Sequence, residues 1–235
     1  MAKQIALVIG VGEGLSASIA RLLHAEGYSL VLAARDTGKL QDLVSETGAL
    51  TVTCDASDPD SVKKLFGQIE GRLAVMVYNP SARVRGPLVE LDPLSVKSAI
   101  EITAFGAFLA GQHAAGMMLA QEMEDGKRGT ILFTGASAGV KGFPQSAPFA
   151  MGKFAQRGLS ESMSRELHPN GIHVAWVNID GGIRNPSRPE RIDPADNPDS
   201  MLDPDEIAKT YLNLINQHRS IWTNEIAVRP WVERF

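Results

Sequence analysis

The sequence predicts an α/β protein built on a parallel sheet of seven strands with helices on both faces. Apolar runs alternate with helical patterns along the chain, which favours parallel strands joined by right-handed crossovers. The first apolar run ends in a glycine-rich turn, residues 10–16, and a helical pattern follows at once. With 235 residues, of which 44% are hydrophobic, the chain is long enough for one large α/β domain, and we expect residues 1–235 to form it.

Apolar runs bounded by turn residues predict the strands. The first run is apolar without alternation, which is typical of a strand buried on both faces. The predicted strands are residues 4–9, 28–34, 50–54, 73–78, 129–134, 171–177 and 225–228. The last of them is expected at an edge of the sheet.

Helical periodicity and start signals predict the helices, which are residues 17–26, 39–46, 58–69, 93–123, 147–168 and 203–217. Asp58-Pro59-Asp60 is an acidic, proline-containing start of the kind that helices prefer. Gly106, Gly111 and Gly116 interrupt the long fourth helix. Because glycine costs helix stability, we expect close packing against another helix at these positions.

The turn after the first strand carries the first functional signal. Gly10, Gly12 and Gly14 lead into Leu15 at the helix start, where bare backbone N–H groups and the helix dipole favour an anion. A strand, a glycine-rich turn and a helix together form a phosphate-binding unit. The alternative is a tight turn that only joins the strand to the helix.

The ends of the second and third strands indicate which nucleotide binds. An acidic residue after the second strand suits the ribose 2′-hydroxyl of NAD, whereas arginine suits the 2′-phosphate of NADP. Here Arg35 comes first and Asp36 follows, so we expect a preference for NADP(H), with NAD(H) possible. The alternative is that Arg35 is a surface residue paired with Asp36. Asp55 could accept a hydrogen bond from the adenine amino group or cap the turn into Ser57.

Composition and charge exclude several classes of function. A net charge of −4 supplies no basic footprint for nucleic acid. Cys54 is the only cysteine, so neither an intrachain disulfide nor a cysteine-based zinc site is possible, and no metal-ligand cluster is evident. The first ten residues lack the features of a signal peptide. No apolar segment is expected to be long enough to span a bilayer. We therefore expect a cytoplasmic protein that has no membrane partner.

From end to end, the chain resembles the short-chain dehydrogenase/reductase family. The resemblance rests on the Gly10 to Gly14 turn, Asp55 after the third strand, Asn79 after the fourth strand and Lys153 on the predicted helix 147–168, in the family's order. It implies a Rossmann-type doubly wound sheet, a nicotinamide cofactor and a small-molecule substrate. It also implies a homodimer or homotetramer built through the long helices.

The chain departs from the family at the catalytic positions. The family's Tyr-x-x-x-Lys becomes Phe149 to Lys153, and the position of the family's serine falls on Ala136, with Ser137 next along the chain. Thr103 stands where the long helix usually has asparagine. Outside the catalytic set, Ser16 replaces the last glycine of the turn, and Pro80-Ser81 replaces Ala-Gly.

These departures leave two expected functions. Phenylalanine cannot donate, accept or ionise, so one expectation is an NADP(H)-dependent oxidoreductase with altered proton chemistry, and the other is a catalytically impaired nucleotide-binding protein with a regulatory or partner-binding role. Tyr78 could donate the proton instead, but packing at the strand end is the favoured role. Residues 184–203 are rich in Pro, Asp and Arg, and we expect a loop that closes over the pocket.

The candidate residues form two sets. The catalytic set is Lys153, Ser137, Thr103 and Phe149, the last at the position of the missing tyrosine. The cofactor-binding set is Gly10, Gly12, Gly14, Leu15, Arg35, Asp55, Asn79, Lys153 and Ile183.

Overall fold

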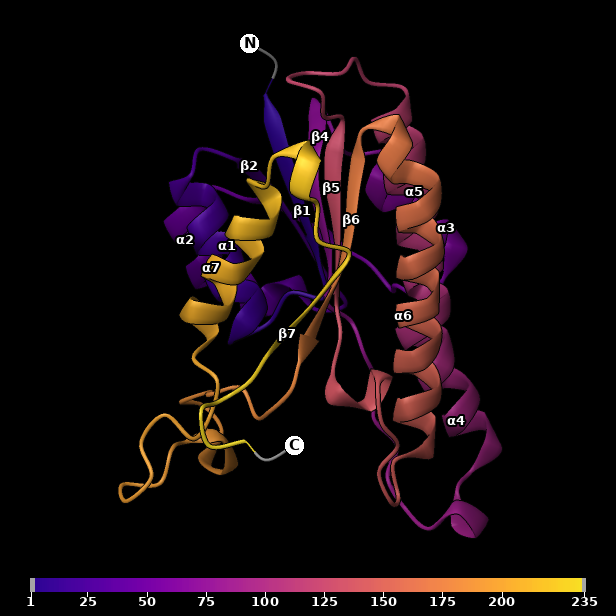
Figure 1. Ribbon diagram of the computed structural model, residues 1–235, viewed down its shortest axis with the longest axis vertical. Coiled ribbons are helices and arrows are strands. Elements are labelled where there is room, and N and C mark those ends of the chain that lie inside the picture. The colour runs from indigo at the N-terminus through magenta and orange to yellow at the C-terminus, as the bar shows by residue number, and fades with distance from the viewer. Residues whose placement is uncertain (1–2, 234–235) are drawn as a thin grey trace.

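The computed structural model describes residues 3–233, so the first two and last two residues of the expected 1–235 domain lie outside the description. Its centre is a seven-stranded sheet in the order β3-β2-β1-β4-β5-β6-β7, with every neighbouring pair parallel. Figure 1 shows α1, α2 and α7 on one face of this sheet and α3, α5 and α6 on the other, with α4 leading into α5. The prediction of a doubly wound parallel sheet is confirmed.

The strands match the predicted runs closely. They are β1 Gln4–Ile9, β2 Ser29–Ala34, β3 Leu50–Thr53, β4 Arg72–Tyr78, β5 Gly129–Thr134, β6 Ile172–Ile179 and β7 Glu225–Val228. Alternate residues of β1 enter different cores: Ile5 and Leu7 face one hydrophobic cluster, whereas Ala6 and Val8 face the other. Because side chains alternate along a strand, an apolar run without alternation fills both cores at once.

The helices are α1 Leu15–Ala25, α2 Gln41–Thr47, α3 Pro59–Phe66, α4 Pro93–Ile100, α5 Gly106–Leu119, α6 Ala147–Leu167 and α7 Pro204–Ile215. Their starts follow the expected signals. Asp58 caps α3 by accepting a hydrogen bond from the backbone N–H of Ser61, and Pro59 takes the first helical position.

The predicted single helix 93–123 is wrong in detail. A π-helical turn, Glu101–Phe105, separates α4 from α5, and the helical stretch ends at Leu119. Sequence periodicity does not reveal this turn, because each side of it is helical. By length and composition Pro93–Leu119 could also cross a membrane, contrary to expectation. In the fold it packs against β4 and α6, as core helices of the same composition do.

The three glycines of this stretch differ in their surroundings. A Cβ atom on Gly106 would collide with the Tyr78 hydroxyl and the Ala56 carbonyl, and one on Gly111 would lie 2.9 Å from Met163 of α6. Gly116 has nothing within 4 Å of such an atom. Packing against another helix is therefore confirmed at Gly111, whereas Gly106 packs against the ends of β3 and β4, and Gly116 packs against nothing.

This difference gives a matched pair of variants. Gly106→Ala should lower the free energy of unfolding by about 1–3 kcal/mol through overpacking. Gly116→Ala, on the same helix in open space, should raise it by up to about 1 kcal/mol through helix propensity. Urea unfolding of the two proteins measures both values, and similar effects at the two positions would contradict the packing described here.

Candidate functional site

A cleft of about 920 Å³ lies at the carboxyl ends of the parallel strands. Its walls come from the turn after β1, the ends of β2 to β5, the loop after β4, the start of α6 and the loop after β6. The strand order reverses between β1 and β4, because the chain adds β2 and β3 on one side of β1 and β4 on the other. Ligands of open α/β sheets bind in the crevice outside such a reversal.

The glycine turn is built for close backbone approach. Gly10 has φ +79°, and a Cβ atom there would lie 2.7 Å from the Pro80 ring. Gly14, at φ +93°, precedes α1 without any side-chain cap. Ser16, which stands where the family's turn has its last glycine, binds the turn instead: its hydroxyl accepts from Gly12 N and donates to Gly12 O. The N–H groups at the start of α1 are thus left for a ligand.

The ends of β2 and β3 present one cation and one carboxylate. Arg35 lines the cleft, is exposed and forms no ion pair with any residue in the range 3–233. Asp36 instead accepts from Gly38 N and pairs with Lys39, so the predicted alternative of an Arg35–Asp36 pair is wrong. Asp55 caps the turn as expected: it accepts hydrogen bonds from the N–H and hydroxyl of Ser57, which lower the pKa of its carboxyl. It also lines the cleft, and its contact with adenine stays a prediction.

Asn79 ties the end of β4 to the turn after β1. Its N–H donates to Ile9 O at 3.0 Å and its side-chain amide donates to Gly10 O at 3.3 Å. Thr103 lies in the π-helical turn, fully buried and away from the cleft, and its hydroxyl accepts from Ala82 N at 3.1 Å. The structure therefore places Thr103 in support of the loop after β4.

Lys153 is held by neutral partners. Its side chain lines the cleft at 2% exposure, and Nζ donates to Thr134 O at 2.5 Å and to Gln156 Oε1 at 3.2 Å. The same Gln156 oxygen accepts from the Trp176 indole at 3.3 Å. Burial without a carboxylate partner lowers the pKa of Lys153 to about 7, with the positive charge of Arg83 adding to the effect. An ammonium has three N–H donors, so one is left for a ligand hydroxyl.

Phe149 is buried with Ala136 and Ala138, and its ring faces Arg83, whose guanidinium carbon lies 4.2 Å from the ring centroid. Ala136 lines the cleft, whereas Ser137, which begins a 3-10 turn, does not.

Tyr78 is fully buried and donates to Ile102 O, and burial raises the pKa of its phenol. The expectation that Tyr78 packs at the strand end is confirmed.

The expected cofactor residues largely converge on the cleft. Those that line it are Gly10, Gly14, Leu15, Arg35, Asp55, Asn79, Lys153 and Ile183, whereas Gly12 does not. Sequence reasoning missed Gln156, which lies three residues beyond Lys153 on the same face of α6, and the arginines of the cleft wall. The Arg-x-Arg pattern at 83–85, soon after Asn79, was the available signal for the latter.

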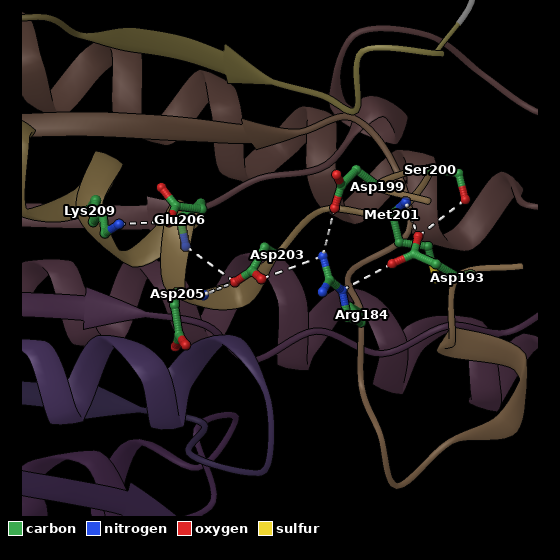
Figure 2. Close-up of polar contacts among 9 residues, drawn as sticks. All are labelled: Arg184, Asp193, Asp199, Ser200, Met201, Asp203, Asp205, Glu206 and Lys209. Atoms are coloured by element: carbon green, nitrogen blue, oxygen red, sulfur yellow. Dashed lines mark hydrogen bonds and ion pairs between the residues drawn. The ribbon is translucent and has the colours of Figure 1, made fainter. Parts of the chain in front are cut away.

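The predicted loop 184–203 is folded around one arginine. Arg184 makes ion pairs with Asp193 at 3.1 Å and with Asp199 and Asp203 at 3.4 Å each (Figure 2). Asp203 also caps α7 by accepting from Asp205 N at 2.8 Å. The base of the loop is therefore joined to the start of α7. Closure of the loop on binding remains a prediction.

Comparison with known proteins places this architecture among dehydrogenases. A sequence model of the short chain dehydrogenase family matches residues 4–188. An uncharacterized oxidoreductase of Staphylococcus aureus strain N315 is 26% identical over 233 residues, 97% of each chain. The crystal structure of a short-chain dehydrogenase from Rhodopseudomonas palustris is 31% identical, covers 97% of this chain and 99% of its own, and has a TM-score of 0.81. A metagenomic short-chain oxidoreductase in complex with NADP is 26% identical, with 99% of each chain covered and a TM-score of 0.81.

The buried lysine predicts a pH dependence of stability. Between its folded pKa of about 7 and the unfolded value of ~10.4, the unfolded chain binds one more proton, so stability rises with pH in that window. In Lys153→Met the group is gone. The free energy of unfolding of the wild type minus that of the variant should therefore rise by ~1 kcal/mol per pH unit between pH 7.5 and 9. Below pH 6 this difference should hardly change with pH.

Urea unfolding at each pH measures this difference, with Lys209→Met on the exposed face of α7 as the control. The pKa of Lys209 is raised by Glu206, so its removal should leave the slope between pH 6 and 9 unchanged. If the free energies of unfolding of wild type and Lys153→Met changed with pH in parallel, the lowered pKa of Lys153 would be contradicted.

Proposed function

The chain belongs to the short-chain dehydrogenase family, and on that basis we propose that it is an NADP(H)-dependent oxidoreductase acting on a carbonyl or alcohol substrate. The observation that carries the cofactor preference is Arg35, an exposed guanidinium at the end of β2 without a carboxylate partner among residues 3–233. The neighbouring carboxylate of Asp36 accepts from Gly38 N and pairs with Lys39. It is therefore already occupied, whereas an NAD-binding acid would accept from the ribose 2′-hydroxyl.

The other cleft residues fit a dinucleotide. The uncapped start of α1 suits the diphosphate, Asp55 suits the adenine amino group, and Ile183 offers an apolar contact on the opposite wall. The NADP complex of the 26% identical metagenomic oxidoreductase supports the same cofactor here. NAD(H) remains possible at lower affinity.

A bound nicotinamide supplies the hydride, and the protein must supply orientation and proton handling. We assign Lys153 to orientation: its remaining N–H is available to a ribose hydroxyl. Phe149 contributes no proton, Ser137 lies off the cleft and Thr103 is buried, so the usual acid is missing. Because general acid–base catalysis contributes about 10²–10⁴-fold, we expect slow turnover of simple ketones.

The same missing acid favours a second candidate function, a cofactor-binding protein with a regulatory or partner-binding role. The two candidates differ in one measurement. An oxidoreductase changes nicotinamide absorbance when given substrate and loses this change in Lys153→Ala. A binding protein takes up NADPH in calorimetry but shows no turnover across a broad panel of carbonyl compounds.

We also propose that the chain forms a homodimer or homotetramer through α5 and α6. Exposed large apolar side chains gather there: Phe105 and Phe108 stack with ring centroids 6.2 Å apart, and Met151 and Phe154 are exposed on α6. Exposed apolar clusters of this kind mark interaction sites. A cytoplasmic location is part of the same proposal, and the buried, free thiol of Cys54 is compatible with it.

Arg35→Ser tests the cofactor assignment. Hydrogen bonds to charged groups contribute about 1.5–3 kcal/mol, so the variant should bind NADPH about 10–100-fold more weakly. NADH carries no 2′-phosphate, and its affinity should stay within a factor of two or three. Calorimetry with both cofactors measures the ratio, and equal losses for NADPH and NADH would argue against a 2′-phosphate contact.

The double variant Phe108→Glu with Phe154→Glu tests the oligomer. Charges placed on a buried apolar interface should yield monomers in size-exclusion chromatography with light scattering. Ile221→Glu, at a more exposed apolar residue in the 3-10 turn before β7, is the control and should keep the wild-type mass. A monomeric wild type, or an unchanged mass in the double variant, would refute the proposed interface.

A further inference from the structure

The cleft is strongly basic although the chain as a whole is acidic. Seven basic side chains line it against three acidic ones: Arg35, Arg83, Arg85, Lys153, Arg184, Arg188 and Arg191 against Glu13, Asp55 and Glu190. Arg35 lies at the cofactor end and Arg184 is neutralised by its three aspartates. The excess charge is therefore concentrated in the loops after β4 and β6.

We propose that Arg83, Arg85 and Arg191 form an anion-binding subsite over Phe149, and that the substrate of this protein carries a carboxylate or phosphate group. This inference rests on the proposed oxidoreductase function, since it names the substrate class of that same cleft. The shared chemistry is an oxyanion with two or more oxygens, which the planar fork of arginine binds in a bidentate manner.

The charges of these three arginines are uncompensated within the protein. None of them forms an ion pair with any carboxylate in the range 3–233, in contrast to Arg184 close by. Partial burial lowers the pKa of Arg83, and the positive charges of Arg191 and Arg85 lower it further, so both charges lie near enough to Arg83 to repel it. Like charges gathered without a counter-ion disfavour one another, and a bound anion relieves that repulsion.

The segment that carries Arg83 and Arg85 is anchored on both sides. Ala82 N donates to the Thr103 hydroxyl at 3.1 Å, and Gly86 N donates to Gln145 O at 3.2 Å. Gln145 itself adopts a left-handed φ of +56°, a conformation rare for a residue with a side chain. Two anchors, one of them a strained residue just ahead of α6, hold the segment in the wall of the cleft.

The ring of Phe149 orients the arginine. The guanidinium of Arg83 lies 4.2 Å from the ring centroid, so one face is covered while the N–H groups at its edge stay free. Phe149 is itself buried against Ala136 and Ala138. The position at which the family resemblance expects a proton donor thus supports a cation that binds an anion.

This subsite is separate from the expected position of the cofactor phosphates. Arg35 follows β2, whereas Arg83 follows β4, and β1 lies between those strands, so two strand spacings of ~4.8 Å separate them at the sheet. The diphosphate is expected at the turn after β1, where Asn185 of the later loop comes within 3.7 Å of a Cβ position on Gly14. Arg83 instead faces Phe149 and α6, beyond β1 and β4.

Arginine labelling in the full-length protein tests the subsite. Phenylglyoxal modifies accessible arginines, and peptide mass spectrometry gives a rate for each of them. In protein saturated with NADPH, inorganic phosphate or malonate should slow labelling of Arg83 at least fivefold, while Arg165, exposed on α6, labels at an unchanged rate. Chloride at matched ionic strength should give no protection. Stronger protection by phosphate or by malonate indicates which headgroup the substrate carries.

Variants separate the contributions of the subsite. Arg191→Met should weaken protection of Arg83 by either anion about tenfold, Arg83→Lys should weaken calorimetric anion binding about tenfold by losing the fork, and Arg165→Met should have no effect. NADPH affinity, measured by calorimetry, should change less than twofold in all three, which also reports that each variant is folded.

Three results would overturn the subsite: no protection by either anion, equal protection by chloride, or full protection by NADPH alone, which would assign the arginines to the cofactor. If the protein did not bind NADPH but phosphate or malonate still protected Arg83 from labelling, the proposed oxidoreductase function would be contradicted. The anion subsite would be retained in that case.

Discussion

The contact between the ends of β1 and β4 is the constraint on which the site depends. Gly10 lies so close to Pro80 that no Cβ atom fits between them, and Asn79 closes the junction through its backbone and side-chain amides. This contact joins the half of the fold that carries the glycine turn to the half that carries α6. Because the strands pair in parallel here, the residues that follow them reach the same edge of the sheet, and one cleft collects residues from the ends of β1 to β6.

Most of the fold could be predicted from the sequence, because its signals are local. Apolar runs without alternation gave strands that fill two cores, and Asp58-Pro59 marked a true helix start. The π-helical turn at Glu101–Phe105 was not predictable, since one extra residue in a helix leaves the surrounding periodicity intact. Gly106, Gly111 and Gly116 read alike in sequence, yet their surroundings depend on which strand or helix lies opposite, which is a tertiary property.

The residues of the candidate site also fall into those that the sequence could predict and those that it could not. Residues that directly follow strands, such as Arg35, Asp55 and Asn79, were predicted because topology alone brings them to the cleft. Long side chains from distant loops were missed, because no local sequence pattern predicts that Arg83 and Arg191 come together in the cleft. The neutral surroundings of Lys153 were equally hidden: the Thr134 carbonyl becomes its partner only when α6 lies beside the end of β5, and Gln156 also accepts from the Trp176 indole of β6.

The π-helical turn carries a consequence for how this protein can change over evolutionary time. Such a turn is equivalent to one residue inserted into a helix, and the wider turn absorbs that residue so that the helices on either side keep their packing. Loss of a single codon there would restore a regular helical turn and leave Pro93–Ile100 and α5 in place, but it would shift Thr103, whose hydroxyl accepts from Ala82 N. The effect of such a deletion would therefore fall on the loop after β4 rather than on the packing of the helices.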